Sequence, residues 1–244
     1  MTALSAKQLL LLWDQGASQL PFQQAAHLLA AACPELSTEA LMNLTIGQRD
    51  ERLLGLRELL FGSSMAGMAS CPACKGRSEF TMNTADIRTL YERSAGEQLS
   101  CAMGEYTVEF RLPRTKDLQA IANETDPGRA RVRILEECIT GAYKSEEPTI
   151  TASLPDDILE AVANRMGEAD READVMLALS CPQCGRHWQE AFDIATFLWS
   201  EISAWAYHTL RDVHTLASRY GWSEADILEM SASRRQHYLT LIGA

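Results

Sequence analysis

The sequence predicts an α+β fold that is mainly α-helical, in which two β-hairpins are separated by a long insertion. Two Cys-Pro-x-Cys motifs, Cys71–Cys74 and Cys181–Cys184, lie 106 residues apart. Residues that alternate between polar and apolar flank them, which is typical of strands. Both ends of the chain instead carry apolar residues at three- and four-residue spacing, which is typical of helices.

The two motifs also predict a metal site. A CxxC turn directs two sulfur atoms to one ion, so two such turns supply the four thiolates of a tetrahedral Zn²⁺. We therefore expect one structural zinc ion per chain in a four-cysteine zinc ribbon that the insertion splits, with the ligands Cys71, Cys74, Cys181 and Cys184. His187 is an alternative ligand, but four thiolates already complete the coordination shell.

Thiol redox chemistry is the other interpretation of these cysteines. A thioredoxin-like CxxC precedes a helix whose dipole lowers the thiol pKa. Here the sequence after each motif is typical of a turn and a strand. A redox site predicts no bound metal, so metal analysis of the purified protein separates the two interpretations.

The composition limits the classes of partner. Of the 244 residues, 46% are hydrophobic and 23% are charged, and the formal net charge is −11. Lys and Arg supply most of the affinity for a phosphate backbone, so an acidic chain favours proteins over nucleic acid as partners. No apolar run approaches the ~18 residues of a membrane span, and no cleavage pattern follows the apolar run at residues 9–12. We expect a cytoplasmic protein without a membrane or small-molecule partner.

The terminal regions are predicted to be helical. In residues 1–62, Pro21 can open a helix that Pro34 ends, and a longer helix ends near Gly62. In residues 195–244, one long helix over 196–220 ends at Gly221, and two short helices follow.

The central regions combine strands and helices. Residues 63–83 and 172–194 share the plan strand, knuckle, turn, strand and Asp-Ile, which predicts the split zinc ribbon. Residues 84–171 form the inserted α+β segment, with a strand over 106–112 that ends at Pro113. Helices are predicted over residues 84–92, 116–124, 128–143 and 155–166, and a polar loop over 144–153.

The sequence contains no common catalytic motif. It has no GxxxxGK[ST], HExxH or GxGxxG pattern. The stretch Gly62–Ala66 differs from the GxSxG motif because Ala66 replaces the second glycine. We therefore expect no catalytic residues and no enzymatic activity.

The ordered features of the chain resemble the baseplate hub assembly proteins of T-even-type phages and their relatives in phage-derived contractile injection systems. The shared features are a CPxC knuckle followed by a strand, an insertion that opens with the strand ending at Pro113, a second knuckle and a tail from Tyr220 to Leu239. The resemblance covers residues 65–242, and the first sixty residues lie outside it. The second knuckle is more regular here than in that family.

The resemblance implies a non-enzymatic assembly factor or chaperone that binds baseplate hub or spike proteins in the cytoplasm of the producing or host bacterium. The N-terminal helices and the region Gly221–Leu241 are the candidate partner contacts. A zinc-ribbon protein that binds nucleic acid or acts in transcription is the alternative. It would need a basic surface at the knuckles, where Lys75, Arg77, Arg186 and His187 are the local candidates.

Overall fold

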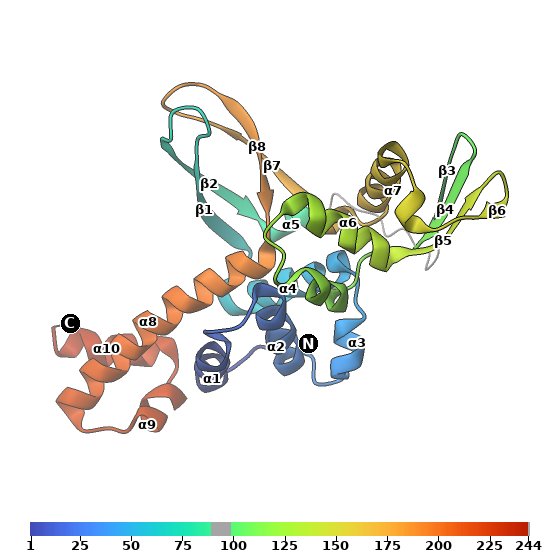
Figure 1. Ribbon diagram of the computed structural model, residues 1–244. Helices are drawn as coiled ribbons and strands as arrows, with labels where there is room; N and C mark the ends of the chain where they lie inside the picture. The colour runs from blue at the N-terminus through green and yellow to red at the C-terminus, as the bar shows by residue number, and fades with distance from the viewer. Residues whose placement is uncertain (89–98, 244) are drawn as a thin grey trace. The chain divides into compact units, whose positions relative to one another are not determined.

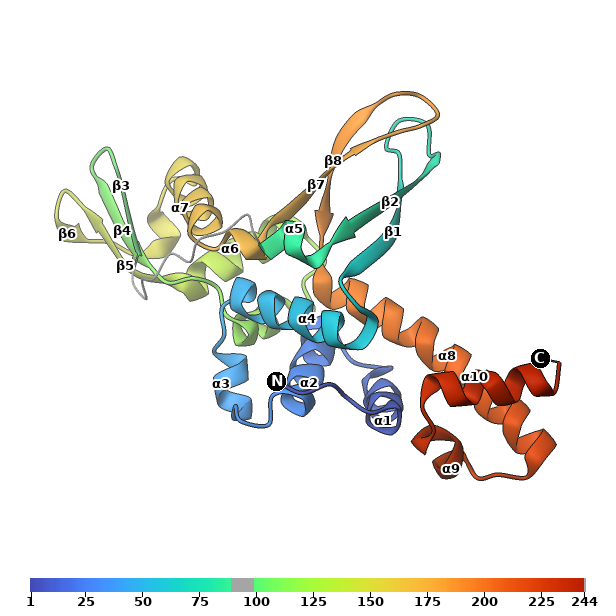
Figure 2. The same cartoon turned by 180° about the vertical axis from the view of Figure 1, so that it is seen from behind.

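The computed structural model describes residues 1–88 and 99–243 and confirms a mainly helical α+β fold (Figures 1 and 2). The chain forms two compact units. The first combines residues 1–35 with residues 194–244, and the second contains residues 36–193. The predicted N-terminal region, residues 1–62, therefore contributes to both units. Among the described residues, no helix combines the length and apolar character that a bilayer span requires.

The first unit contains five helices in its described residues: α1 (Ala6–Gly16), α2 (Pro21–Ala32), α8 (Ile194–Tyr220), α9 (Glu224–Glu229) and α10 (Ala232–Leu241). Helix α8 packs against the other four. Gly16 permits a close approach of α1 to α8, because a Cβ atom there would lie 2.2 Å from the Trp199 ring. The apolar core toward the C-terminus joins α1, α8, α9 and α10 through Leu10, Ala206, Val213, Leu216, Ile227, Leu228 and Leu239.

Two antiparallel hairpins of the second unit carry the cysteine motifs. Strands β1 (Ser64–Ser70) and β2 (Arg77–Asn83) form the first, and β7 (Val175–Ser180) and β8 (His187–Phe192) form the second. The strand prediction is therefore confirmed at both motifs. Each hairpin is a separate two-stranded sheet, so contacts between the hairpins must be made by side chains and turns rather than by a shared strand ladder.

The insertion forms a four-stranded antiparallel sheet in the order β3-β4-β5-β6. Its strands are β3 (Leu99–Met103), β4 (Tyr106–Phe110), β5 (Ile139–Lys144) and β6 (Glu147–Pro148). The described part of the insertion also contains helices α6 (Pro127–Cys138) and α7 (Asp156–Ala169) and the 3₁₀ turns η1 (Thr115–Ile121) and η2 (Thr151–Ser153), and a further 3₁₀ turn, η3 (Arg171–Ala173), lies at its end. Its own buried core contains Val108, Phe110, Leu135, Cys138, Ile158, Val162 and Met166.

Several predicted elements of the insertion were wrong. The helix expected over 128–143 ends at Cys138, and the chain continues directly as β5, because Ile139 and Thr140 are β-branched and β4 offers its hydrogen-bonding edge. Residues 115–121 form the 3₁₀ turn η1, and the expected loop 144–153 contains β6 and η2. Strand β3 was not predicted. Helix α5 (Thr84–Arg88) confirms the start of the helix expected over 84–92, and residues 89–92 lie outside the described part.

The remaining helices of the second unit, α3 (Thr38–Met42) and α4 (Ile46–Phe61), contact the segment that follows β4 and the end of the insertion. The Ile46 N–H donates to the Pro113 carbonyl (3.1 Å), just after β4. The Gly47 N–H donates to Asp170 (3.0 Å), just after α7. A Cβ atom on Gly47 would lie 1.9 Å from the Asp170 carboxylate, so glycine allows this approach. The first turn of α4 therefore joins the segment just after β4 to the end of the insertion.

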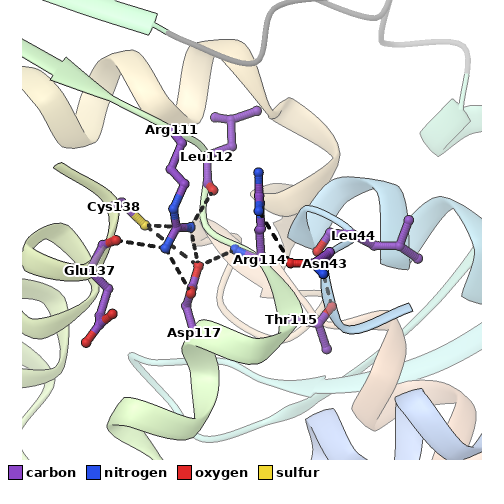
Figure 3. A network of polar contacts seen from close by, with 9 residues as sticks. All are labelled: Asn43, Leu44, Arg111, Leu112, Arg114, Thr115, Asp117, Glu137 and Cys138. Carbon is purple, nitrogen blue, oxygen red and sulfur yellow. Dashed lines mark hydrogen bonds and ion pairs between the residues drawn. The ribbon is translucent and has the colours of Figure 1, made fainter. Parts of the chain in front are cut away.

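A partly buried ion pair lies at the junction of β4, η1 and α6 (Figure 3). Arg111 donates to Asp117 at 2.5 and 3.0 Å and to the Glu137 carbonyl at 2.8 Å. The Arg114 N–H donates to the same Asp117 carboxylate at 2.7 Å. Burial opposes ionisation of Asp117, but the Arg111 and Arg114 hydrogen bonds outweigh it and lower its pKa. The end of β4, η1 and the end of α6 therefore meet at one carboxylate.

Candidate metal centre

Each cysteine pair lies at the tip of its hairpin. Cys71 follows β1 directly and Cys181 follows β7 directly. In the first knuckle the Cys71 N–H donates to the Gly76 carbonyl (2.9 Å), and the Lys75 N–H donates to the Cys71 carbonyl (2.9 Å). These two hydrogen bonds close a tight turn at the first knuckle.

The second knuckle repeats this turn. The Cys181 N–H donates to the Arg186 carbonyl (2.8 Å), and the Gly185 N–H donates to the Cys181 carbonyl (2.9 Å). The internal repeat predicted from the sequence therefore extends to the backbone hydrogen bonds. Gly185 has a φ of 72°, and the equivalent Lys75 has a φ of 59°. The turn requires a left-handed residue at this position, which glycine adopts without steric cost and lysine does not.

The hairpins bring all four cysteine sulfur atoms together. They lie within 4.8 Å of one another. Two close contacts join different hairpins: 3.7 Å between the Sγ atoms of Cys71 and Cys184, and 3.6 Å between those of Cys74 and Cys181. A tetrahedron with metal–sulfur bonds of ~2.3 Å has sulfur–sulfur edges of roughly 3.8 Å, so the cluster has the size that such an ion needs.

Contacts beside the sulfur atoms also join the two knuckles. Gln183 lies against Gly76, where a Cβ atom would be 2.2 Å from its Oε1 atom. The Ser78 hydroxyl is 3.5 Å from the Ser180 carbonyl, between β2 and β7. Gly76 was not singled out in the sequence, because only the fold shows that the opposite knuckle packs on it.

Burial differs between the first and the second cysteine of each motif, and the knuckle backbone acts on the thiol of the first. Cys71 and Cys181 are buried, whereas Cys74 and Cys184 are exposed. The Cys74 and Ala73 N–H groups lower the pKa of Cys71 to about 6 in spite of burial, and the Cys184 and Gln183 N–H groups lower that of Cys181. The knuckle backbones therefore favour the thiolate form that metal binding requires.

The last thiol of the cluster behaves differently. The Arg186 N–H lowers the pKa of Cys184, but the neighbouring sulfurs of Cys181 and Cys74 outweigh it and raise the pKa to about 11. Crowded thiolates repel one another, so one of them retains its proton unless a cation compensates the charge. This donor set is suited to a divalent metal ion.

All four cysteines predicted as ligands meet in this cluster, and among the described residues the group contains no further donor. His187 begins β8 and is not part of it. Four donors leave no open coordination position, which is the arrangement of a structural site rather than a catalytic one.

The fold and the cysteine cluster define a class: an α+β protein whose two hairpins are joined at a site suited to a metal ion. Comparison with family models then identifies the family. The model described as T4 bacteriophage base plate protein matches residues 2–199, and the chain belongs to this family. The predicted relationship is thus confirmed, with two differences. The match includes the first sixty residues, and it excludes the tail after residue 199. No curated protein and no solved structure matches the chain significantly.

Proposed function

We propose that the four cysteines bind one structural zinc ion. The support is the donor set itself, because four clustered thiolates match the preference of Zn²⁺ and their distances fit its tetrahedral geometry. The ion supplies a closed four-coordinate link between the two hairpins. Cys71 and Cys74 would hold it from one side of the insertion and Cys181 and Cys184 from the other. Such a link can contribute on the order of 10 kcal/mol to folding.

On this scaffold the protein acts as a non-enzymatic assembly factor or chaperone for the baseplate hub of a phage tail or contractile injection system. Family membership over residues 2–199 is the observation that carries this function. The division into helical ends, a split ribbon (63–83 and 172–194) and an insertion (84–171) suits a protein that presents several surfaces to partners. Hub or spike proteins are the expected partners, in the cytoplasm of the producing or host bacterium.

Co-expression with the hub and spike proteins of the same tail-gene cluster tests this function. We expect a hub or spike protein to co-purify with the tagged chain, and a Cys71→Ser/Cys181→Ser variant to lose it. Cys101→Ser is the matched control, since Cys101 lies outside the cluster. Recovery of no hub or spike protein would contradict the assembly role. Salt-sensitive binding of random DNA would instead support the nucleic-acid alternative.

A further inference from the structure

The N-terminal end of α10 carries an unusual concentration of unpaired positive charge. Helix α10 begins after the N-cap Ser231, and Arg234 and Arg235 lie in its first turns. Positive side chains are unfavourable there, because the helix dipole and the unpaired N–H groups already make that end positive. Among the described residues, neither arginine has a carboxylate within ion-pair distance.

Arg235 is the decisive residue. It is only 6% exposed, yet its guanidinium makes a single hydrogen bond in the described part of the chain, from Nη1 to the Met230 carbonyl at 2.8 Å. Its Nε atom is buried without a partner. Met230 directly precedes the N-cap, so this bond places the guanidinium at the N-terminal end of the helix. A buried cation with unused donors carries a desolvation cost that an incoming anion would offset.

An aromatic cluster lies beside these charges. The Arg234 guanidinium is 5.8 Å from the centre of the Tyr238 ring. Tyr220 and Trp222 stack with ring centres 4.4 Å apart, and Tyr238 packs edge-on against Trp222 at 4.8 Å. These five residues, Tyr220, Trp222, Arg234, Arg235 and Tyr238, form what we call the α10 patch. Tyr, Trp and Arg are the residue types that dominate protein–protein binding energy.

We propose that the α10 patch is a docking site for an acidic segment of a partner protein, with a Glu or Asp carboxylate accepting hydrogen bonds from Arg235 and from the first N–H groups of α10. The aromatic neighbours favour a polypeptide over a free anion, because their rings offer contact area to a chain that carries the carboxylate. The identity of the partner as a baseplate protein rests on the proposed function, but the site itself does not.

Direct titration tests the site without any baseplate protein. The probe is acetylated hexaglutamate, with hexaglutamine as the uncharged control peptide. Binding is followed by the intrinsic tryptophan fluorescence of the protein and by the NMR signal of the Arg235 Nε–H group. We expect saturable binding of hexaglutamate only, a shift of the Arg235 signal, and clear weakening as salt rises from about 50 to about 300 mM.

Variants distinguish binding at the α10 patch from nonspecific electrostatic attraction of the peptide to the protein. Arg234 is exposed, so Arg234→Gln should leave the fold intact and weaken hexaglutamate binding about tenfold, because it removes a positive charge beside the bound carboxylate. Arg235→Lys keeps the charge but removes the planar guanidinium and should also weaken binding. Arg211→Gln, at an exposed position on α8, is the matched control and should bind as the unmodified protein does.

Three results would overturn the proposal: no binding of hexaglutamate, equal binding to the Arg234→Gln variant, or inorganic phosphate binding as tightly as the peptide, which would indicate a general anion site. Peptide binding without co-purification of a hub or spike protein would support the docking site and contradict the assembly role. Co-purification that survives Arg234→Gln/Arg235→Lys would support the assembly role and overturn the docking site.

Discussion

The buried carboxylate of Asp50 should contribute a part of the protein's stability that falls as the pH rises. Asp50 is 7% exposed, and its carboxylate lies 2.7 Å from the Arg49 guanidinium. Burial raises its pKa from 3.8 to about 6; Arg49 opposes the shift, while Asp193 and Asp170 add to it. The folded state therefore holds this proton more tightly than the unfolded state. The resulting stability is complete below the unfolded pKa and is lost as the pH rises through about 6.

The magnitude follows from the shift. A difference of about 2 pKa units corresponds to about 3 kcal/mol over the whole pH range, of which about 1.4 kcal/mol is lost between about pH 5 and pH 7.5. Urea unfolding across this range, in the presence of zinc, measures it. The Asp50→Asn variant should lose this part of the pH dependence, and the difference between the two profiles cancels the pH dependence of metal binding.

Asp174→Asn provides the control for the substitution itself, because Asp174 is exposed in the same unit. Its profile should run parallel to that of the unmodified protein. The explanation by a desolvated carboxylate is wrong if the Asp50→Asn profile also runs parallel to that of the unmodified protein. It is also wrong if the free energy of unfolding rises with pH in the unmodified protein but not in the Asp50→Asn variant.

Two further changes probe the junction and the knuckles. Arg111→Met leaves Asp117, which is 6% exposed, without its ionic partner and should lower the free energy of unfolding in urea by about 3–5 kcal/mol. The double variant Arg111→Met/Asp117→Leu should lose less than the sum of the two single losses. Additive losses would contradict the ion pair. Lys75→Gly replaces a lysine whose backbone is in the left-handed region and should stabilise the protein by about 0.5–1 kcal/mol in thermal unfolding. Gly185→Ala at the equivalent position of the second knuckle should destabilise it. A destabilised Lys75→Gly variant would show that the two knuckles do not share one turn.

The cysteine cluster was the most predictable part of the structure. Its four cysteines are marked by residue type and spacing, and the alternation beside them predicts the hairpins, both of which are local signals. What the sequence did not indicate was which contacts hold the knuckles together. Gln183 against Gly76 depends on how two segments about a hundred residues apart pack, and no local pattern records that.

The insertion was harder to predict for a related reason. Apolar residues continue past Cys138, so the helical pattern extends over the segment that becomes β5. Pairing with β4 overrides the helix there, because a tertiary partner can outweigh weak intrinsic propensity. The anchoring of the insertion to α4 through Asp170 and Gly47 is likewise a long-range contact, over 123 residues of sequence.

The pairing of the terminal helices also depends on long-range contacts. Each terminal region was recognised as helical from its own apolar spacing. That α1 and α2 pack with α8 in one unit, while α4 belongs to the other, follows from side-chain fit such as Trp199 against Gly16. Fit of this kind needs both partners in three dimensions and leaves no signal in either segment alone.

Metal analysis of the purified protein tests the central proposal most directly. We expect about one zinc per chain by mass spectrometry of the intact protein, loss of that zinc in Cys71→Ser/Cys181→Ser, and full retention in Cys101→Ser. A folded protein that carries no zinc when purified without chelator, or a Cys71→Ser/Cys181→Ser variant that keeps it, would contradict a zinc ion shared by the two hairpins.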